Sequence, residues 1–339
     1  MKNKKTYTVE STPENVQWGV FDPNKEPVVK VSSGATVKIE TVTPPRDSHL
    51  DALTSGGIDE ADVLDDEVTI SEEVTQSGPG PHVVTGPIAI EDAEPGDVLE
   101  VQITDIELRA PYGINLFMPN GGELSEEFPY EEVEIVPFDL EKGVAEFGRD
   151  IEIPLDPFLG IMAVSPSPSE GKTDTAPPDY FGGNLDLKHL GAGATLYLPV
   201  HAEGALFWGG DGHGIQGNGE VCLTAAETSL TATFRFILHK DTGRLNWPLA
   251  ETEDHYIVVG LHESLDNSLH QALKQCISFL HNQKGLSKAD AYRLASLAVD
   301  FNITQVVNGN KGVHGLIPKN IFDDDGELDF SEEYADIQL

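Results

Sequence analysis

Residues 98–108 read VLEVQITDIEL, and this stretch, rich in β-branched residues, is the longest of several strand-like runs in the chain. Similar runs occur at residues 6–10, 28–33, 36–42, 151–155, 161–166 and 195–200, separated by proline, glycine and aspartate. β-Branched residues favour extended backbone, and the intervening residue types favour turns. The first 250 residues therefore predict a mainly β body, of the sandwich or barrel-like kind, built from many short strands. Within it, VCLTAAETSLTATFRFIL, residues 221–238, is predicted to form a hairpin with its turn near residues 227–229.

The hydrophobic pattern changes to a helical one after residue 260. LDNSLHQALKQCISFLHNQ, residues 265–283, carries apolar side chains at helical spacing. A second helix is predicted over LSKADAYRLASLAV, residues 286–299, with Ser287 as its N-cap, and two closing strands follow. We expect a β body over residues 1–250, a smaller α+β part over 251–325 and an acidic tail over 326–339.

The composition narrows the classes of partner. The chain has 58 acidic and 21 basic residues, a formal net charge of −37, and no dense basic patch after its first few residues. Nucleic acid is therefore not expected as a partner, because phosphate binding draws on lysine and arginine. No apolar run reaches the roughly 18 residues that cross a bilayer, and MKNKKTYTVE lacks the apolar core of a secretory signal. We expect a cytoplasmic protein that binds no membrane, and the acidity suggests a saline or alkaline habitat.

Two clusters of candidate metal ligands interrupt the strand-like sequence. HAEGALFWGGDGHGIQGNGE, residues 201–220, is predicted to form a glycine-rich loop in which the backbone approaches a ligand closely. In it, Asp211, His213 and Glu220 are candidate ligands, since Asp-x-His aims two donors at one divalent ion. In PPRDSHLDAL, residues 44–53, His49 and Asp51 share a face if the chain is extended. The alternative for this second cluster is a solvated turn.

Three long segments resemble the acetamidase/formamidase family, in the family's order. They are TVTPPRDSHLDAL (residues 41–53), HVVTGPIAIEDAEPGDVLEVQI (82–103) and FGGNLDLKHLGAGATLYLPVHAEGALFWGGDGHGIQGNGEVCLTAAE (181–227). The resemblance implies hydrolysis of short aliphatic amides, formamide or acetamide, to ammonia and a carboxylic acid, by a homo-oligomer. The family loop often reads GDAHAAQGDGE; here Asp211, His213, Gln216 and Glu220 match, whereas Asn218 replaces a carboxylate. A charge at position 218 is therefore not required.

Amide hydrolysis needs an activated nucleophile, a polarised carbonyl and a proton for the leaving nitrogen. A divalent metal supplies the first two, because it lowers the pKa of bound water and polarises the carbonyl oxygen. We expect the metal ligands to be His49, Asp51, Asp211 and His213. Mixed histidine and carboxylate donors favour Zn²⁺, and Ca²⁺, Mn²⁺ and Mg²⁺ remain open.

Further residues are assigned to proton transfer and to the substrate. Glu220, or failing that Glu203, is the expected general base and acid. His82, which follows the rigid GPGP turn at residues 78–81, is a further candidate catalytic residue. Asn184 and Gln216 are expected to orient the amide, because an amide side chain carries both a donor and an acceptor.

Two alternatives remain open at this point. Cys222 lies two residues after Glu220, so in a strand the two side chains would share a face and a thiol nucleophile would have a base beside it. Its apolar neighbours favour a structural thiol instead. The second alternative is a non-catalytic, metal-stabilised β-rich binding or assembly module, in which carboxylates hold a structural Ca²⁺. An open coordination position beside a base would distinguish catalysis from such a closed site.

Overall fold

The computed structural model describes residues 6–43, 53, 58–240, 245–323 and 328–330. Strands make up most of its regular structure, and its two longest helices follow residue 260. The mainly β fold predicted from the sequence is therefore confirmed, with helices in the C-terminal part. None of the helices in the described ranges is long and apolar enough to span a membrane.

One sheet has nine strands and draws on both ends of the chain. Its order is β1 (Thr6–Val9), β5 (Thr36–Glu40), β17 (Leu230–His239), β7 (Val98–Leu108), β15 (Thr195–Pro199), β18 (Leu249–Glu251), β19 (His255–His262), β21 (Lys311–Pro318) and β20 (Asp300–Gln305). Neighbouring strands run antiparallel, except that β1 and β5 are parallel. The boundary predicted near residue 250 falls in β18, so strands from both sides of it share this sheet. Division into separate domains stays a prediction.

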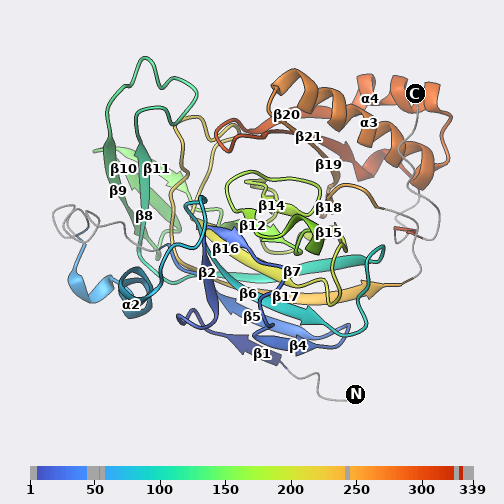
Figure 1. The fold of residues 1–339 in the computed structure, drawn as a ribbon. Helices are drawn as coiled ribbons and strands as arrows, with labels where there is room; N and C mark the ends of the chain where they lie inside the picture. The colour runs from blue at the N-terminus through green and yellow to red at the C-terminus, as the bar shows by residue number, and fades with distance from the viewer. Residues whose placement is uncertain (1–5, 44–52, 54–57, 241–244, 324–327, 331–339) are drawn as a thin grey trace.

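A second sheet carries most of the residues that matter below. Its order is β14 (Gly182–Asn184), β12 (Phe158–Ala163), β16 (Phe207–His213), β6 (Val83–Ile90) and β2 (Val16–Trp18), and β4 (Val29–Val31) also pairs with β6. A four-stranded sheet follows the order β11 (Ile151–Pro154), β10 (Val144–Phe147), β9 (Glu132–Asp139) and β8 (Tyr112–Phe117), and stands at the upper left of Figure 1. A small pair joins β3 (Val20–Phe21) to β13 (Thr173–Asp174).

The two large sheets pack face to face. Phe207 of β16 contacts Phe234 and Phe236 of β17, with ring centroids 5.3 and 4.9 Å apart. All three side chains are fully buried, within one hydrophobic cluster that takes residues from both sheets. Burying a phenylalanine contributes about 1.5–3 kcal/mol. The body is therefore a β-sandwich held by apolar contact between its inner faces.

The C-terminal helices cover one end of the nine-stranded sheet. α3 (Leu265–Lys284) packs on β19 and β21, beside α4 (Lys288–Ala298), at the upper right of Figure 1. Ser287 accepts a hydrogen bond from the backbone N–H of Asp290, which confirms its predicted role as N-cap. Within the described ranges, the remaining helices are α2 (Asp65–Glu73) and three short 3₁₀ turns, η1 (Glu60–Asp62), η2 (Pro168–Glu170) and η3 (Lys319–Ile321).

The glycine-rich loop predicted within residues 201–220 is in part a strand. β16 runs from Phe207 through Gly209, Gly210 and Gly212 to His213, and the residues before and after it form turns and loops. The glycines are needed for close packing rather than for turning. A Cβ on Gly212 would lie 2.4 Å from the carbonyl oxygen of Thr228. The close approach that the structure shows is to the backbone of a neighbouring segment, and the predicted approach to a ligand stays a prediction.

The hairpin predicted over residues 221–238 is wrong. Only its second half is a strand, β17, which pairs with β5 and β7. Residues 221–229 are irregular, and Glu227 forms isolated bridges with Ile114 and His213. The backbone groups of this segment pair with β8 and β16 and not with β17, because Glu227 takes part in a buried polar cluster.

Candidate metal and catalytic centre

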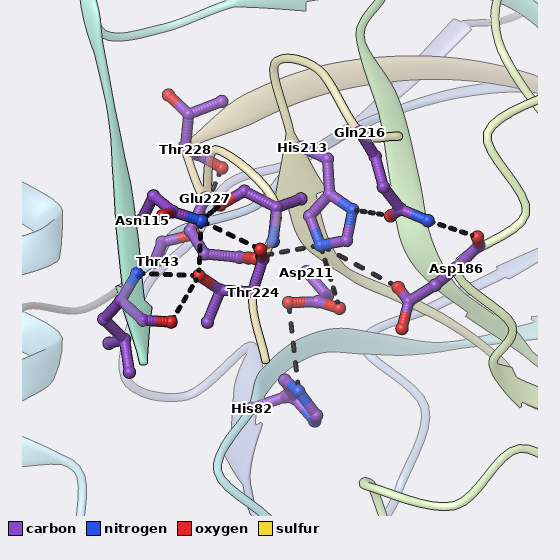
Figure 2. Close-up of polar contacts among 12 residues, drawn as sticks. Thr43, His82, Asn115, Asp186, Asp211, His213, Gln216, Thr224, Glu227 and Thr228 are labelled. Carbon is purple, nitrogen blue, oxygen red and sulfur yellow. Dashed lines mark hydrogen bonds and ion pairs between the residues drawn. The ribbon is translucent and has the colours of Figure 1, made fainter. Parts of the chain in front are cut away.

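Four carboxylates and one imidazole meet at the end of the second sheet. Asp211 and His213 end β16, and Asp186 follows β14 by two residues. Glu220 and Glu227 come from the irregular segment after β16. Figure 2 shows the His213 ring with Gln216 at one nitrogen and carboxylates gathered around the other. The strand register thus brings together acidic groups that are up to 41 residues apart in the sequence.

His213 is held by its two ring nitrogens in different ways. Gln216 Nε2 donates to the carbonyl oxygen of Asp186 at 2.8 Å, so Gln216 Oε1 faces His213 Nδ1 at 2.9 Å and accepts its hydrogen. This leaves His213 Nε2 facing Glu227 Oε2 at 3.2 Å, Asp211 Oδ2 at 3.4 Å and Asp186 Oδ1 at 3.8 Å. Nε2 is buried and has no aligned hydrogen-bond partner among the described residues. A hydrogen-bonded Nδ1 with a free Nε2 is the arrangement of a metal-binding histidine.

The acidic groups fit a cation. Asp211, His213 and Glu227 offer ligand atoms that lie within 4.8 Å of one another, and so do Asp186, His213 and Glu220. All five residues are buried or nearly so, and buried like charges are costly unless an opposite charge neutralises them. Nitrogen and carboxylate oxygen are donors that Zn²⁺ and other divalent ions accept. The donor set and the unpaired nitrogen therefore suit a divalent metal.

The pKa values of the cluster residues show how the carboxyls and the His213 ring hold protons without a cation. Burial raises the pKa of Glu227 to about 7, and burial together with Asp186 raises the pKa of Glu220 well above its ordinary value. Burial opposes ionisation of Asp211, yet His82 and His213 lower the pKa of that carboxyl. Burial also opposes a charged His213, but Glu227 and Asp211 outweigh it and raise its pKa. Protons on the His213 ring and on the carboxyls thus offset the negative charge that a cation would otherwise balance.

The backbone at the cluster is strained. Asp186, Asp211 and Glu220 have φ values of 46°, 58° and 45°, in the left-handed region that non-glycine residues rarely adopt. Each such residue costs on the order of 1–3 kcal/mol, and such strain concentrates at functional sites. Beneath them, a Cβ on Gly160 of β12 would lie 2.3 Å from Asp186 Oδ1 and 2.5 Å from Asp211 Oδ2. The fold therefore keeps space for these carboxylates at a cost in stability.

Two asparagines connect the carboxylates. With its NH₂ turned toward them, Asn184 donates to Asp211 Oδ2 at 2.9 Å and to Asp186 Oδ1 at 3.2 Å. Its oxygen then accepts from Asn308 Nδ2 at 3.0 Å, and the same nitrogen donates to Asp186 Oδ2. Both asparagines line a cavity of about 300 Å³. Asn184 thus contacts both the acidic cluster and the space beside it.

The other residues predicted for the site differ in whether they line the cavity. His82 lines the cavity, with Nε2 3.9 Å from Asp211 Oδ1 and Nδ1 3.3 Å from Thr175 Oγ1. Glu220 also lines it, and its Oε2 is buried without a hydrogen-bond partner in the described residues. Glu203 is exposed and is not among the described residues that line the cavity. His49 and Asp51 lie outside the described residues.

Gln216 and Cys222 are occupied by contacts within the protein. Gln216 bonds His213 and the backbone of Asp186 and is not among the described cavity-lining residues. Cys222 is half-buried, and its Sγ accepts from Asn115 Nδ2 at 3.4 Å. Cys222 is likewise missing from the described lining of the cavity.

The sequence reasoning missed three members of the cluster. Asp186 lies in LDL between two leucines that are 1% exposed, and a carboxylate between buried apolar residues was the available signal. Glu227 was assigned to the turn of the hairpin that does not form. Asn308 lies in VVNGN after β20, where its residue type indicates only a turn.

Solved structures and curated proteins resemble this chain. A recombinant predicted acetamidase/formamidase from the thermophile Thermoanaerobacter tengcongensis has a TM-score of 0.79 at 26% identity, over 93% of this chain and 96% of that one. An acetamidase from Bacillus halodurans has a TM-score of 0.77 at 26% identity, over 93% and 98% of the two chains. An acetamidase of Mycolicibacterium smegmatis is 25% identical over 203 residues, 43% of this chain and 50% of that protein. This chain spans about half the length of the curated relatives it matches.

The likeness also extends to a whole family. The sequence profile described as the Acetamidase/Formamidase family matches residues 5–170 and 168–324, which together include every element and every cluster residue described above. The chain therefore belongs to the acetamidase/formamidase family.

Proposed function

We propose that this protein hydrolyses linear amides, formamide and acetamide being the simplest, to ammonia and the corresponding carboxylic acid. The observation that supports this most directly is the free Nε2 of His213 among four buried carboxylates beside a cavity. Family membership agrees with it. A structural role alone would not require strained acidic residues whose groups face an open space.

Asp211, His213 and Glu227 are the proposed metal ligands among the described residues, with Zn²⁺ as the first candidate and Mn²⁺, Mg²⁺ and Ca²⁺ as the others. His49 and Asp51 remain sequence predictions for the same ion. When bound, the ion would supply Lewis acidity, lowering the pKa of a water molecule and polarising the amide carbonyl. Gln216 would position His213 for this task, because it occupies the other ring nitrogen.

Glu220 is the proposed proton carrier. It lines the cavity, and burial together with the neighbouring Asp186 raises its pKa well above the ordinary value, which favours a carboxyl that can hold a proton and pass it on. It would take a proton from the attacking water and deliver it to the amide nitrogen, so that ammonia leaves. His82 is proposed to stabilise negative charge on the carbonyl oxygen, and Asn184 to hydrogen-bond the amide. Glu203 is exposed and is not among the described residues that line the cavity.

The test is ammonia release from formamide and acetamide by the purified protein, before and after removal of metal with a chelator. Activity that disappears and returns with one added ion supports the proposal and identifies the ion. Turnover that survives complete metal removal contradicts the metal role, and Cys222→Ala would then test the thiol as nucleophile.

The second candidate function is a non-catalytic, metal-stabilised module. The two overlapping sets of ligand atoms around His213 are consistent with a structural ion as well. In that case, metal would raise the thermal stability and no amide would be turned over. Replacing Glu220 would then leave both the stabilisation by metal and the absence of amide turnover unchanged. The only effect would be the change in stability that comes from altering a buried side chain.

A further inference from the structure

One wall of the cavity is an apolar row on β8. Ile114, Leu116 and Met118 all line the cavity, and they alternate along β8 and the residue after it. Side chains at alternate positions of a strand point to the same face and are about 6.6–7 Å apart. The row therefore extends about 13 Å along one side of the cavity.

The row begins at the acidic cluster. The backbone N–H of Ile114 donates to the carbonyl oxygen of Glu227 at 2.8 Å, and the N–H of Glu227 donates to that of Ile114 at 2.9 Å. Leu116 lies two residues farther along the strand, where the Thr224 hydroxyl accepts from the backbone N–H of Leu116 and donates to its carbonyl oxygen. A molecule whose reacting carbonyl lies at the cluster would thus meet Ile114 first and then Leu116.

The lining of the cavity is also apolar at several positions outside this row. Half of its described lining residues are apolar, including Val42, Val83, Leu223 and Val307. Leu116 is 8% exposed and Ile114 is 4% exposed, so the row is covered and not part of the open surface. The remaining nine described lining residues are polar, and four of them are acidic, which disfavours an anionic group on the acyl side.

The cavity is large for the simplest amides. A water molecule takes about 30 Å³ in the liquid, so about 300 Å³ holds roughly ten groups of that size. Formamide and acetamide have three and four non-hydrogen atoms and would leave the apolar row facing water. Filling the row with methylene groups would remove that apolar surface from water, which favours binding by about fourfold for each methylene.

We propose that the row Ile114–Leu116–Met118 binds the acyl chain of the substrate, and that the preferred substrate is a primary amide with an unbranched apolar acyl chain of about four to six carbons. This rests on the proposed amidase function for the reacting end of the molecule. The described cavity lining contains no lysine or arginine to pair with a carboxylate on the acyl group. Uncharged apolar chains are therefore selected over the amides of dicarboxylic acids.

The first experiment compares kcat/KM for formamide, acetamide, butyramide and hexanamide with the metal-loaded protein. Hexanamide has four more methylenes than acetamide, so we expect kcat/KM to rise from acetamide to hexanamide by at least tenfold and by up to about 250-fold. A maximum at formamide or acetamide would overturn the acyl-chain proposal and leave the amidase proposal intact.

A variant pair tests the position of the row. Leu116→Phe adds bulk within the row and is expected to lower kcat/KM for hexanamide at least tenfold while changing that for acetamide less than threefold. Phe117→Leu is the matched control, because Phe117 points to the other face of β8 and packs on Phe128 and Tyr130. Its chain-length preference should equal that of the parent. An equal loss for both amides in Leu116→Phe, with an unchanged melting temperature, would overturn the assignment of the row.

A binding measurement separates this inference from the catalytic one. Titration calorimetry on the metal-free protein should give a Kd for hexanamide at least tenfold lower than for acetamide, and Leu116→Phe should remove the difference. If no amide is turned over with any metal but this binding preference is found, the amidase function fails and the acyl site stands. Equal affinities for the two amides would overturn the acyl site whatever the activity.

Discussion

Gln216 accepts a hydrogen bond from Nδ1 of His213 at 2.9 Å while its own NH₂ group donates to the backbone of Asp186 at 2.8 Å. The second bond fixes which end of the Gln216 amide faces the ring, and so fixes the His213 tautomer. Gln216, which follows His213 by three residues, thus determines which nitrogen of His213 is available to the acidic cluster.

Gln216→Leu should weaken metal binding, because nothing would then hold the His213 ring and its tautomer. Loss of such an orienting partner typically costs ten- to a hundredfold in metal affinity. Competition with a chromogenic chelator measures the Zn²⁺ affinity. Gln283→Leu, on the outside of α3, is the control and should leave the affinity unchanged. An unaltered affinity in Gln216→Leu would remove the orienting role.

Gly160→Ala should displace the Asp186 and Asp211 carboxylates, since the new Cβ would overlap with both. We expect metal binding and amide hydrolysis to be lost, with a destabilisation of about 1–3 kcal/mol. Gly217→Ala is the control, because a Cβ there meets nothing within 4 Å. Urea unfolding and metal titration of both variants give the comparison. Normal metal affinity in Gly160→Ala would show that the ion does not need these two carboxylates.

Glu220→Gln and Glu203→Gln should separate the two candidate bases. Glu220 is buried at the cavity and Glu203 is exposed. Removal of a general base costs about 10²–10⁴-fold in rate, so we expect that loss in kcat for Glu220→Gln and less than a twofold change for Glu203→Gln. Steady-state ammonia release measures both. The opposite ranking would transfer the proton-transfer role to Glu203.

Glu67 should make the stability depend on pH. Burial raises its pKa to about 7 from 4.5, although Tyr112 and Ser229 donate hydrogen bonds to it. Between these two values the folded state binds more protons than the unfolded state, so stability falls as pH rises from 4.5 to 7 and then levels off. The loss is about 3 kcal/mol at most. Urea unfolding of the parent and of Glu67→Gln at pH 4.5–8 measures it. Identical slopes for the two proteins would contradict the assignment.

The acidity predicts a salt requirement. With 58 acidic and 21 basic residues, the folded chain repels itself, and salt screens that repulsion. We expect the melting temperature to rise between low and molar NaCl, as followed by circular dichroism. A melting temperature that is constant or falls with salt would argue against a saline habitat.

The sequence predicted those features that depend on local pattern. The runs at residues 98–108 and 195–200 became β7 and β15, and the helical spacing after residue 260 became α3 and α4 with Ser287 as N-cap. It also picked out Asp211 and His213 as candidate ligands from their Asp-x-His spacing, although it placed them in a loop and the structure places them on strand β16. These features depend on residues close together in the sequence and not on contacts with residues far away in it.

Only the tertiary structure joined Asp186, Glu220 and Glu227 to His213, and only it separated Glu203 from them. Those contacts depend on β12, β14 and β16 lying side by side, and on residues 221–229 leaving the sheet before β17 begins. The hairpin predicted over residues 221–238 does not form for the same reason. A strand-like composition favours extended backbone, but the partner of each segment is set by burial of the whole sandwich and by the hydrogen bonds that buried polar groups require. The chemistry of each residue is therefore local, whereas the assembly of the site is a property of the packed fold.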